Sequence, residues 1–421
     1  MNYWRSITLY FVLLLSLWMP LFAAGLSCPT DGQSGALLDG IIGEIRSQST
    51  IDKILERKLP AIVAHGKNRN IAEEGTWPNL KHAVQSGDGW LTTLEVDAMV
   101  TRDGKFVLMH DPTFHRLVKD YQTDPQMVNR FQQEYPDLAK LKAGQWDFNL
   151  FDEAALYDMK EIKERFRFFD EASGFEFEPM TLDELLQAIK VEGEFRVPTY
   201  AANPRAPPAR PEVRASSYGL EPEVIKTKTP LSLYIDFKPV NNYTRRLYGL
   251  SDWHWIRTSW SDAQLRGFTR GSIVHLSDEL KLAKAHDKVF IAVRHPEIAK
   301  MTKEVDPKIV TMASPDHVTK NFSTQEFIKA VEEFLPYQPK IVEVKYLEHI
   351  LDPTFRAWAK EKKLKIFFNQ IEQVDIRQFE GIYRDNLAKL LDDLTAPGND
   401  LLLQTNSVEE LSKAFGKRYD P

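Results

Sequence analysis

Two carboxylates at alternate positions of an apolar run are the first candidates for chemistry in this 421-residue chain. Glu95 and Asp97 are two residues apart on a predicted strand, so their side chains project from the same face. Their neighbours Leu94, Val96 and Ala98 are apolar and are expected to pack outward against helices. Two carboxylates side by side on an inward face repel each other unless a cation neutralises them. The pattern therefore favours a metal site over a solvated strand edge.

A second pair repeats this arrangement at the end of another apolar run. Asp236 and Lys238 share one face of the predicted strand that starts at Leu231. Asp236 would supply a third oxygen ligand for a hard cation such as Mg²⁺ or Ca²⁺. Lys238 would meet a phosphate oxygen as a point charge. Because Cys28 is the only cysteine, zinc held by thiolates is disfavoured.

Two histidines lie where predicted strands meet their following loops. His65 ends the buried run that begins at Ala61, and His110 is followed directly by Asp111. Histidine titrates near neutral pH, so two histidines that flank a metal site can donate and accept protons there. Their spacing relative to the carboxylate pair favours a catalytic role over that of a histidine packed in an apolar core.

The elements that must position these residues alternate along the chain. Predicted strands cover residues 61–65, 91–100, 105–110, 231–237, 289–293, 308–312, 341–344, 365–368 and 400–404. Predicted helices cover 79–85, 182–190, 324–335, 353–362 and 376–391. Such alternation is typical of a mostly parallel α/β fold. Eight or nine strands fit a TIM (β/α)8 barrel, with a doubly wound sheet as the alternative that the pattern alone leaves open.

One region, residues 114–230, interrupts this alternation after the third strand. It is charged and aromatic, and it contains a Pro-rich run at residues 203–211 that cannot form regular structure. We interpret it as an insertion at the catalytic mouth that helps to set substrate choice. The predicted organisation is a helical lead-in at residues 28–58 and a barrel at 59–421 that carries this insertion.

The first 27 residues have the pattern of a targeting segment. Arg5 precedes an almost wholly apolar stretch, Ile7–Leu26, and small residues follow before Cys28. This predicts a signal peptide, with an uncleaved membrane anchor or a lipid on Cys28 as alternatives. The expected location is extracytoplasmic, either periplasmic or secreted, with anchoring to a membrane as the alternative. The formal net charge of -6 and the lack of a nucleic-acid-binding motif argue against a nucleic-acid partner.

The ordered motifs resemble those of the glycerophosphodiester phosphodiesterase family. The matching segments are Ala64-His65-Gly66, Glu74-Gly75-Thr76, Glu95-Val96-Asp97, Thr101-Arg102-Asp103-Gly104, His110-Asp111, Thr181 to Leu186, Asp236-Phe237-Lys238 and Asp400 to Asn406. The resemblance is dense from His65 to Leu117 and sparse but ordered from Thr181 onward. It covers neither the N-terminal segment nor the insertion.

The resemblance implies a TIM barrel with a site of defined roles. Glu95, Asp97 and Asp236 would bind the metal, and His65 and His110 would be the general acid and base. Glu74 would support the site or bind substrate near the phosphate. Two departures from the family pattern stand out, because Gly66 replaces an arginine that would grip the phosphate and Asp236 replaces a glutamate.

The loop after His65 offers substitutes for that arginine. Lys67 and Arg69 are close enough in sequence to reach the phosphate, although a lysine cannot bind it bidentately. The implied function is metal-dependent hydrolysis of glycerophosphodiesters, small or lipid-derived, to glycerol 3-phosphate and an alcohol. Two alternatives are a phospholipase-type phosphodiesterase that acts on lipid head groups and a non-catalytic barrel that binds phosphodiesters.

Overall fold

The computed structural model describes most of the chain from Ser49 onward. The described residues are 49–57, 59–65, 76–87, 89–111, 114, 117–118, 154–170, 175–198, 222–250, 260–315, 317–318, 321–369, 401–406 and 408–419. The predicted N-terminal targeting segment, the Pro-rich run and the predicted helix at 376–391 lie outside these ranges. None of the helices within them is long and apolar enough to cross a membrane.

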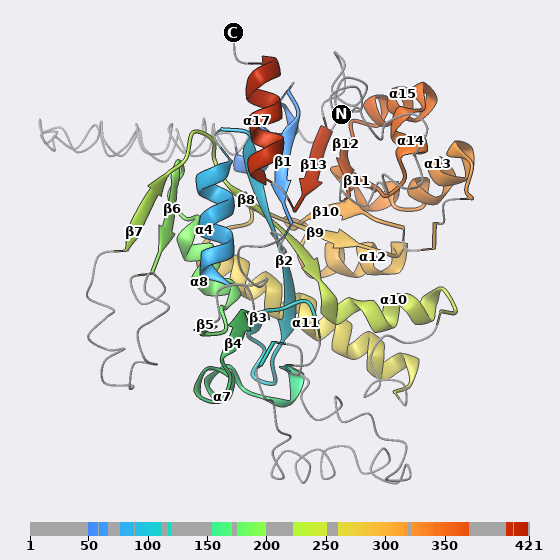
Figure 1. The fold of residues 1–421 in the computed structure, drawn as a ribbon. Helices are drawn as coiled ribbons and strands as arrows, with labels where there is room; N and C mark the ends of the chain where they lie inside the picture. Colours follow the sequence, from blue (N-terminus) through green and yellow to red (C-terminus); the bar gives the residue numbers. More distant parts are fainter. Residues whose placement is uncertain are drawn as a thin grey trace, which may run out of the picture. The chain divides into compact units, whose positions relative to one another are not determined.

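Eight parallel strands of the described residues close into a barrel (Figure 1). They are β1 (Ala61–Ala64), β2 (Leu91–Val100), β8 (Ser232–Phe237), β9 (Val289–Val293), β10 (Val310–Ala313), β11 (Ile341–Val344), β12 (Lys365–Phe368) and β13 (Leu401–Thr405). Each pairs in parallel with its neighbours, and β1 pairs with both β2 and β13. This closure confirms the predicted TIM barrel and excludes the open, doubly wound sheet.

The third strand of the chain, β3 (Phe106–Leu108), is not one of the eight. It pairs antiparallel with the far end of β2, where Ala98 lies opposite Leu108. The insertion does follow the third strand in sequence. In the barrel it therefore lies between the second strand, β2, and the third, β8, and β3 directly precedes it.

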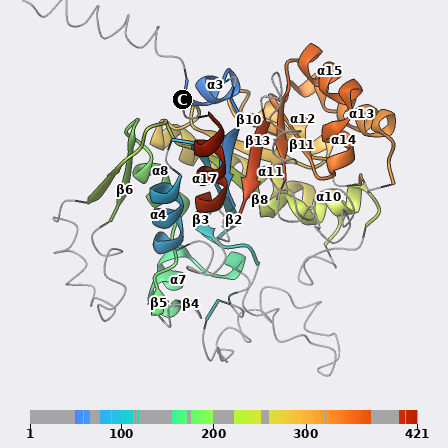
Figure 2. The same ribbon diagram turned by 45° about the horizontal axis from the view of Figure 1, so that its top comes forward.

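Helices surround the barrel strands. Those outside the insertion are α3 (Thr50–Leu55), α4 (Trp77–Ser86), α10 (Asn241–Leu247), α11 (Asp262–Ala283), α12 (Pro296–Val305), α13 (Thr324–Glu332), α14 (Leu347–Leu351), α15 (Pro353–Glu361) and α17 (Val408–Tyr419), with short 3-10 turns at Lys238–Val240 and Leu335–Tyr337. The C-terminal α17 packs beside α4 and β1, as Figure 2 shows. The last described helix thus packs against the first strand of the barrel.

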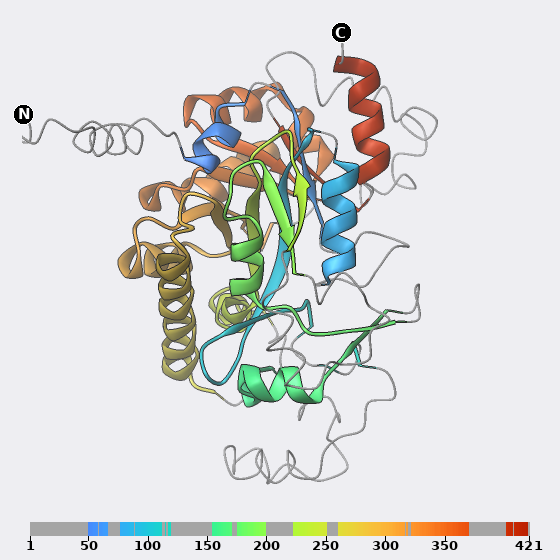
Figure 3. The same cartoon turned by 90° about the vertical axis from the view of Figure 1, so that its left-hand side faces the viewer.

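The longest described helix, α11, was not predicted from the sequence. It begins with a capping box in which the Ser261 hydroxyl accepts from the Gln264 backbone N–H and the Gln264 side chain accepts from the Ser261 N–H. It ends at Lys284, which has a left-handed φ of 54°. Figure 3 shows α11 lying beside α8 (Leu182–Ala188) of the insertion. The glycines at 267 and 271 weakened its helical pattern.

Apolar side chains fill both faces of the barrel wall. Inside, Tyr234 of β8 stacks on Phe290 of β9 at a ring-centroid distance of 5.3 Å and meets Phe367 of β12 edge-on. Outside, Leu94, Val96 and Ala98 join the large core between strands and helices, as predicted. The strand β2 therefore turns its intervening residues inward, and Glu95 and Asp97 are among these.

The described part of the insertion contains both helices and strands. Its described elements are α7 (Met159–Arg165), α8, a 3-10 turn at Ala154–Leu156, and two hairpins, β4 (Phe168–Asp170) with β5 (Phe175–Phe177) and β6 (Glu194–Val197) with β7 (Glu223–Lys226). A separate apolar cluster ties this region to β3, in which Phe114 stacks on Phe166 at 4.1 Å and meets Tyr157 edge-on. The strands of these hairpins are three or four residues long.

Candidate active site

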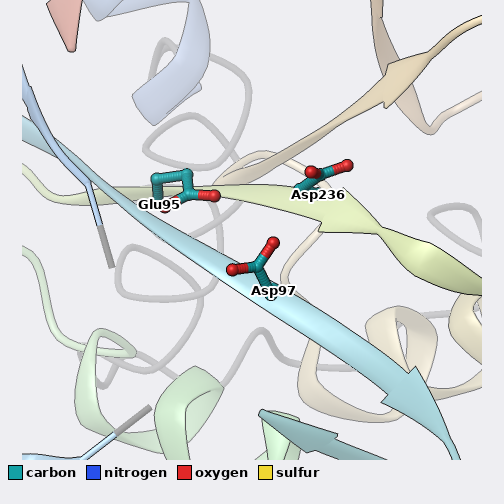
Figure 4. Close-up of side chains that lie close together, drawn as sticks. All are labelled: Glu95, Asp97 and Asp236. Carbon is teal, nitrogen blue, oxygen red and sulfur yellow. The ribbon is translucent and has the colours of Figure 1, made fainter. Parts of the chain in front are cut away.

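Three buried carboxylates meet near the carboxyl end of the barrel. Glu95 and Asp97 extend from β2 and Asp236 extends from β8 (Figure 4). Asp97 and Asp236 are register partners on these adjacent parallel strands. Each of the three side chains offers an oxygen within 4.8 Å of the other two, and each residue is at most 7% exposed. The structure thus brings together the three residues that were predicted to bind a metal.

Two cations lie against these carboxylates. The Lys238 ammonium is 2.6 Å from an oxygen of Asp97 and 2.6 Å from an oxygen of Asp236. The Arg294 guanidinium donates from one nitrogen to both oxygens of Asp236, at 2.9 and 2.8 Å. Lys238 was predicted to contact a phosphate. In the structure its ammonium holds Asp97 and Asp236 together. Three negative and two positive side chains leave a net charge of about -1 in a buried cluster.

This network fixes the charge states of its members. Burial by itself would raise the pKa of Asp236, but Arg294 and Lys238 beside it hold that pKa well below its ordinary value. Burial likewise works against a charged Lys238, but Asp236 and Asp97 raise the pKa of its ammonium above the ordinary value. Asp236 and Lys238 are therefore both charged at neutral pH.

The donor set fits a hard divalent cation. Mg²⁺ and Ca²⁺ prefer carboxylate oxygens, and a cation that touches three oxygens brings them to within about 4–5 Å of one another. Lys238 and Arg294 use only part of the lone pairs on Asp97 and Asp236. A net negative cluster at this depth favours a cation. Glu95, Asp97 and Asp236 are thus the residues that would hold it.

His65 lies beside the carboxylates at the end of β1. Its Nδ1 is 2.6 Å from the side-chain oxygen of Asn406, which follows β13, and its Nε2 is 3.9 Å from an oxygen of Glu95. Because the amide oxygen can only accept, it fixes the proton of a neutral ring on Nδ1. Nε2, the nitrogen that faces the carboxylates, is then the proton acceptor.

His110 is presented differently. It follows β3, and its Nδ1 is 2.8 Å from an oxygen of Asp111. Its side chain is 42% exposed, whereas Met109 before it and Phe114 beyond it are buried in the apolar cluster of the insertion. That cluster anchors the segment that carries His110, so the insertion positions one of the two predicted catalytic histidines.

Polar side chains continue around the carboxyl end of the barrel. In strand order from β1 they are His65, Asp97, Asp236, Arg294, Ser314, Glu343, Asn369 and Asn406. The buried Glu343 accepts hydrogen bonds from the Ser314 hydroxyl and the Asn369 amide. Active sites of TIM barrels lie at this end, so the ring is where substrate binding is expected.

The remaining predicted site residues fall outside the described ranges. Glu74, Lys67 and Arg69 all lie within residues 66–75, between His65 and α4. The Thr101–Gly104 motif, in contrast, is described and forms a turn. The Thr101 hydroxyl accepts from the Lys105 N–H and donates to Asp103, and Gly104 has a positive φ of 74°. This motif therefore shapes the β2–β3 turn.

Sequence reasoning did not single out Arg294. The next residue, His295, accepts a hydrogen bond at Nδ1 from the Glu297 N–H and caps α12. A polar residue directly after the apolar run Val289–Val293 was the available signal. Asn406 also had one, since the Thr-Asn pair at the end of the last strand is part of the resemblance.

A comparison with known families identifies the dense part of this resemblance. The sequence profile of the Glycerophosphoryl diester phosphodiesterase family matches residues 64–228. This stretch contains His65, Glu95, Asp97 and His110, and the match confirms the resemblance that the motifs indicated. It supports the prediction of a phosphoric diester hydrolase. No curated protein matches the chain.

Several solved structures align with 84–88% of this chain at low identity. A glycerophosphodiester phosphodiesterase from Agrobacterium tumefaciens is 11% identical, with a TM-score of 0.45 over 84% of this chain and 100% of that one. A glycerophosphoryl diester phosphodiesterase from Parabacteroides distasonis is 15% identical, with a TM-score of 0.45 over 88% and 92%. A phosphodiesterase from Oleispira antarctica, solved with the product sn-glycerol-3-phosphate, is 14% identical, with a TM-score of 0.46 over 87% and 99%.

Proposed function

We propose that this chain, whose residues 64–228 match the glycerophosphoryl diester phosphodiesterase family, is a divergent member that hydrolyses glycerophosphodiesters with a divalent cation. The observation that carries the proposal is the buried cluster of Glu95, Asp97 and Asp236 with His65 beside it. The products would be glycerol 3-phosphate and an alcohol. Mg²⁺ and Ca²⁺ both suit the oxygen donors.

The two histidines divide the proton transfers in this proposal. His65 is the general base, because Asn406 keeps the proton on Nδ1 and leaves Nε2 to accept one. His110 is the general acid, because the Asp111 carboxylate at its Nδ1 stabilises a positively charged ring. Both assignments follow from what each ring contacts on the side away from the substrate.

In the proposed reaction one bond to phosphorus forms while another breaks, and each histidine transfers one proton. A water oxygen forms a bond to phosphorus while the bond between phosphorus and the alcohol oxygen breaks. The water proton passes to Nε2 of His65, and His110 gives a proton to the leaving oxygen. A cation on the three carboxylates would polarise the non-bridging oxygens and offset their charge.

Hydrolysis of a panel of diesters tests the proposal. The panel contains glycerophosphocholine, glycerophosphoethanolamine, glycerophosphoinositol, lysophospholipids and a chromogenic diester, each with Mg²⁺, Ca²⁺ or a chelator. We expect release of glycerol 3-phosphate that chelation abolishes. His65→Ala and His110→Ala should each lower kcat by about 10²- to 10⁴-fold.

A matched control and two outcomes complete this test. His82→Ala changes a histidine of α4 that contacts Ser86, so it should leave kcat unchanged. Release of a phosphorylated head group from lysophospholipids would favour the phospholipase alternative. Binding of intact diester without turnover, with either metal, would favour the non-catalytic barrel.

The proposed location is extracytoplasmic, based on the apolar N-terminal segment and Cys28. Fractionation of the expressing cells, followed by N-terminal sequencing of the mature chain, checks it. A mature chain that retains residues 1–27 in the cytoplasm would contradict this location.

A further inference from the structure

Arg294 lies at the carboxyl end of the barrel, beside the carboxylate cluster. It follows β9 directly, next to β8, and its guanidinium holds both oxygens of Asp236. Its side chain is 15% exposed, so the group is sheltered but still reaches the surface of the site. The backbone there is fixed, because the Tyr248 hydroxyl donates to the Arg294 carbonyl at 2.9 Å and the next residue caps α12.

The guanidinium of Arg294 would balance the charge of the site when a cation and a phosphodiester are bound. Glu95, Asp97 and Asp236 carry three negative charges, and Lys238 and Arg294 carry two positive ones. A divalent cation and one singly charged phosphodiester then make the whole assembly neutral. Without Arg294 the same assembly would be net negative, and an anionic substrate would be held less well in a buried site.

Geometry distinguishes the two cations. Lys238 is a point charge that already lies between Asp97 and Asp236, with 5% of its side chain exposed. Arg294 has a planar group with five N–H donors, and one of its nitrogens donates to both oxygens of Asp236. A guanidinium can bridge a carboxylate and a phosphate in one plane, whereas an ammonium cannot.

The sequence supplies the reason why such a residue is needed. Gly66 follows His65 directly, where the family resemblance places an arginine that grips the phosphate. The loop residues Lys67 and Arg69 were the substitutes considered from sequence alone. Arg294 differs from them in that its position is fixed by a strand end and by its ion pair with Asp236.

We propose that Arg294 binds the phosphate of the substrate and so takes the place of the arginine that this chain lacks after His65. The assignment rests on the proposed function and adds to it a residue from a different strand. The phosphate would then contact two positive groups, the Arg294 guanidinium and the divalent cation. Asp236 would connect them, because it contacts Arg294 and would also be a ligand of the cation.

The binding of inorganic phosphate to the full chain in Mg²⁺ tests this role directly by titration calorimetry. Arg294→Met should weaken phosphate binding by about 10- to 100-fold, because it removes charge-assisted hydrogen bonds. The affinity for Mg²⁺ alone should be equal or tighter, since a cation beside Asp236 is lost. Arg294→Lys keeps the charge against Asp236, so it should retain stability but still bind phosphate about tenfold more weakly.

Arg270→Met is the matched control, since Arg270 pairs with Glu304 on the exposed surface and should leave phosphate binding unchanged. Unchanged phosphate affinity in both Arg294 variants, with weaker Mg²⁺ binding or lower stability, would show that Arg294 only holds Asp236 and would overturn the assignment. If the wild type neither binds phosphate nor hydrolyses diesters, the proposed function itself fails. If it hydrolyses diesters and Arg294→Met has the same KM and kcat, only the assignment fails.

Discussion

Replacement of Lys238 by methionine should show how much the ammonium of Lys238 stabilises the buried carboxylate cluster. The ammonium of Lys238 is 2.6 Å from both Asp97 and Asp236, and its side chain is 5% exposed. Methionine has a similar length and no charge. The variant Lys238→Met thus leaves Asp97 and Asp236 buried without their shared partner, while Arg294 still holds Asp236.

The magnitude follows from this burial. Removal of one partner of a buried ion pair costs about 3–5 kcal/mol, because the remaining charge is left uncompensated. Since Arg294 continues to neutralise Asp236, we expect the lower end, a loss of about 3 kcal/mol in the free energy of unfolding. Mg²⁺ should return much of this loss, because a ligand at about 100 times its Kd stabilises the folded state by about 2.7 kcal/mol.

The pH range of the effect follows from the direction of each shift. The pKa of Asp236 is lowered in the folded state despite burial, so its stabilisation is present above the ordinary value of 3.8 and is lost as the pH falls through the lower one. The pKa of Lys238 is raised against the effect of burial, so its stabilisation is complete below 10.5 and is lost as the pH rises further. The difference between wild type and variant should therefore be nearly constant from about pH 5 to pH 9.

Urea unfolding followed by tryptophan fluorescence, with chelator and with Mg²⁺, measures this difference. Lys226→Met is the control, because Lys226 pairs with Glu194 but is 76% exposed and should cost less than about 1 kcal/mol. The reasoning is refuted if Lys238→Met is as stable as Lys226→Met in chelator. It is also refuted if Mg²⁺ stabilises the variant no more than the wild type, since the loss of a competing cation should strengthen metal binding.

Two further predictions concern single side chains. Asn406→Ala should lower kcat by about 5- to 10-fold with little change in KM, because His65 loses the acceptor that fixes its tautomer. An unchanged kcat with an unchanged pH–rate profile would contradict this prediction. The pKa of Glu279 is raised to about 7, mainly by burial and further by Asp183 and Asp103, although Lys105 opposes the shift. A raised carboxyl pKa lowers stability as the pH rises from about 4.5 to 7, so Glu279→Gln should be more stable than wild type by up to about 3 kcal/mol at pH 8 and nearly equal at pH 5 in thermal unfolding. Equal stability of the two proteins at both pH values would remove the basis for the second prediction.

The strand alternation predicted a mostly parallel α/β fold and the carboxylate cluster, and the family resemblance added the closed barrel. Glu95 and Asp97 share a face because side chains on a strand alternate, and the apolar residues between them join the outer core. Asp236 had to lie near them, because polar residues at the carboxyl ends of parallel strands meet at one end of the barrel. The register that places Asp97 directly opposite Asp236 could not be predicted, since the two strands are far apart in sequence.

Other features depend on contacts that no local pattern reveals. The strand at Lys105 to His110 was a good candidate for the barrel wall, but β3 is three residues long and pairs antiparallel with β2. The helix α11 was missed because glycines interrupt its apolar pattern, and its capping box was not used. Arg294 was missed because a charged residue after a strand is common on surfaces, and only the ion pair with Asp236 marks it as part of the site.

The two cations of the site have different consequences for the evolution of its specificity. Lys238 lies between two carboxylates of neighbouring strands, so it is needed for stability before any ligand binds, and its replacement is costly. Arg294 reaches Asp236 from a third strand and holds both oxygens of this carboxylate. A chain that gains such an arginine at a strand end can therefore lose a phosphate-binding arginine from the loop after His65 and keep the charge balance of the site. The loop would then be free to change with the alcohol of the substrate, while the phosphate stays fixed by groups on the barrel strands.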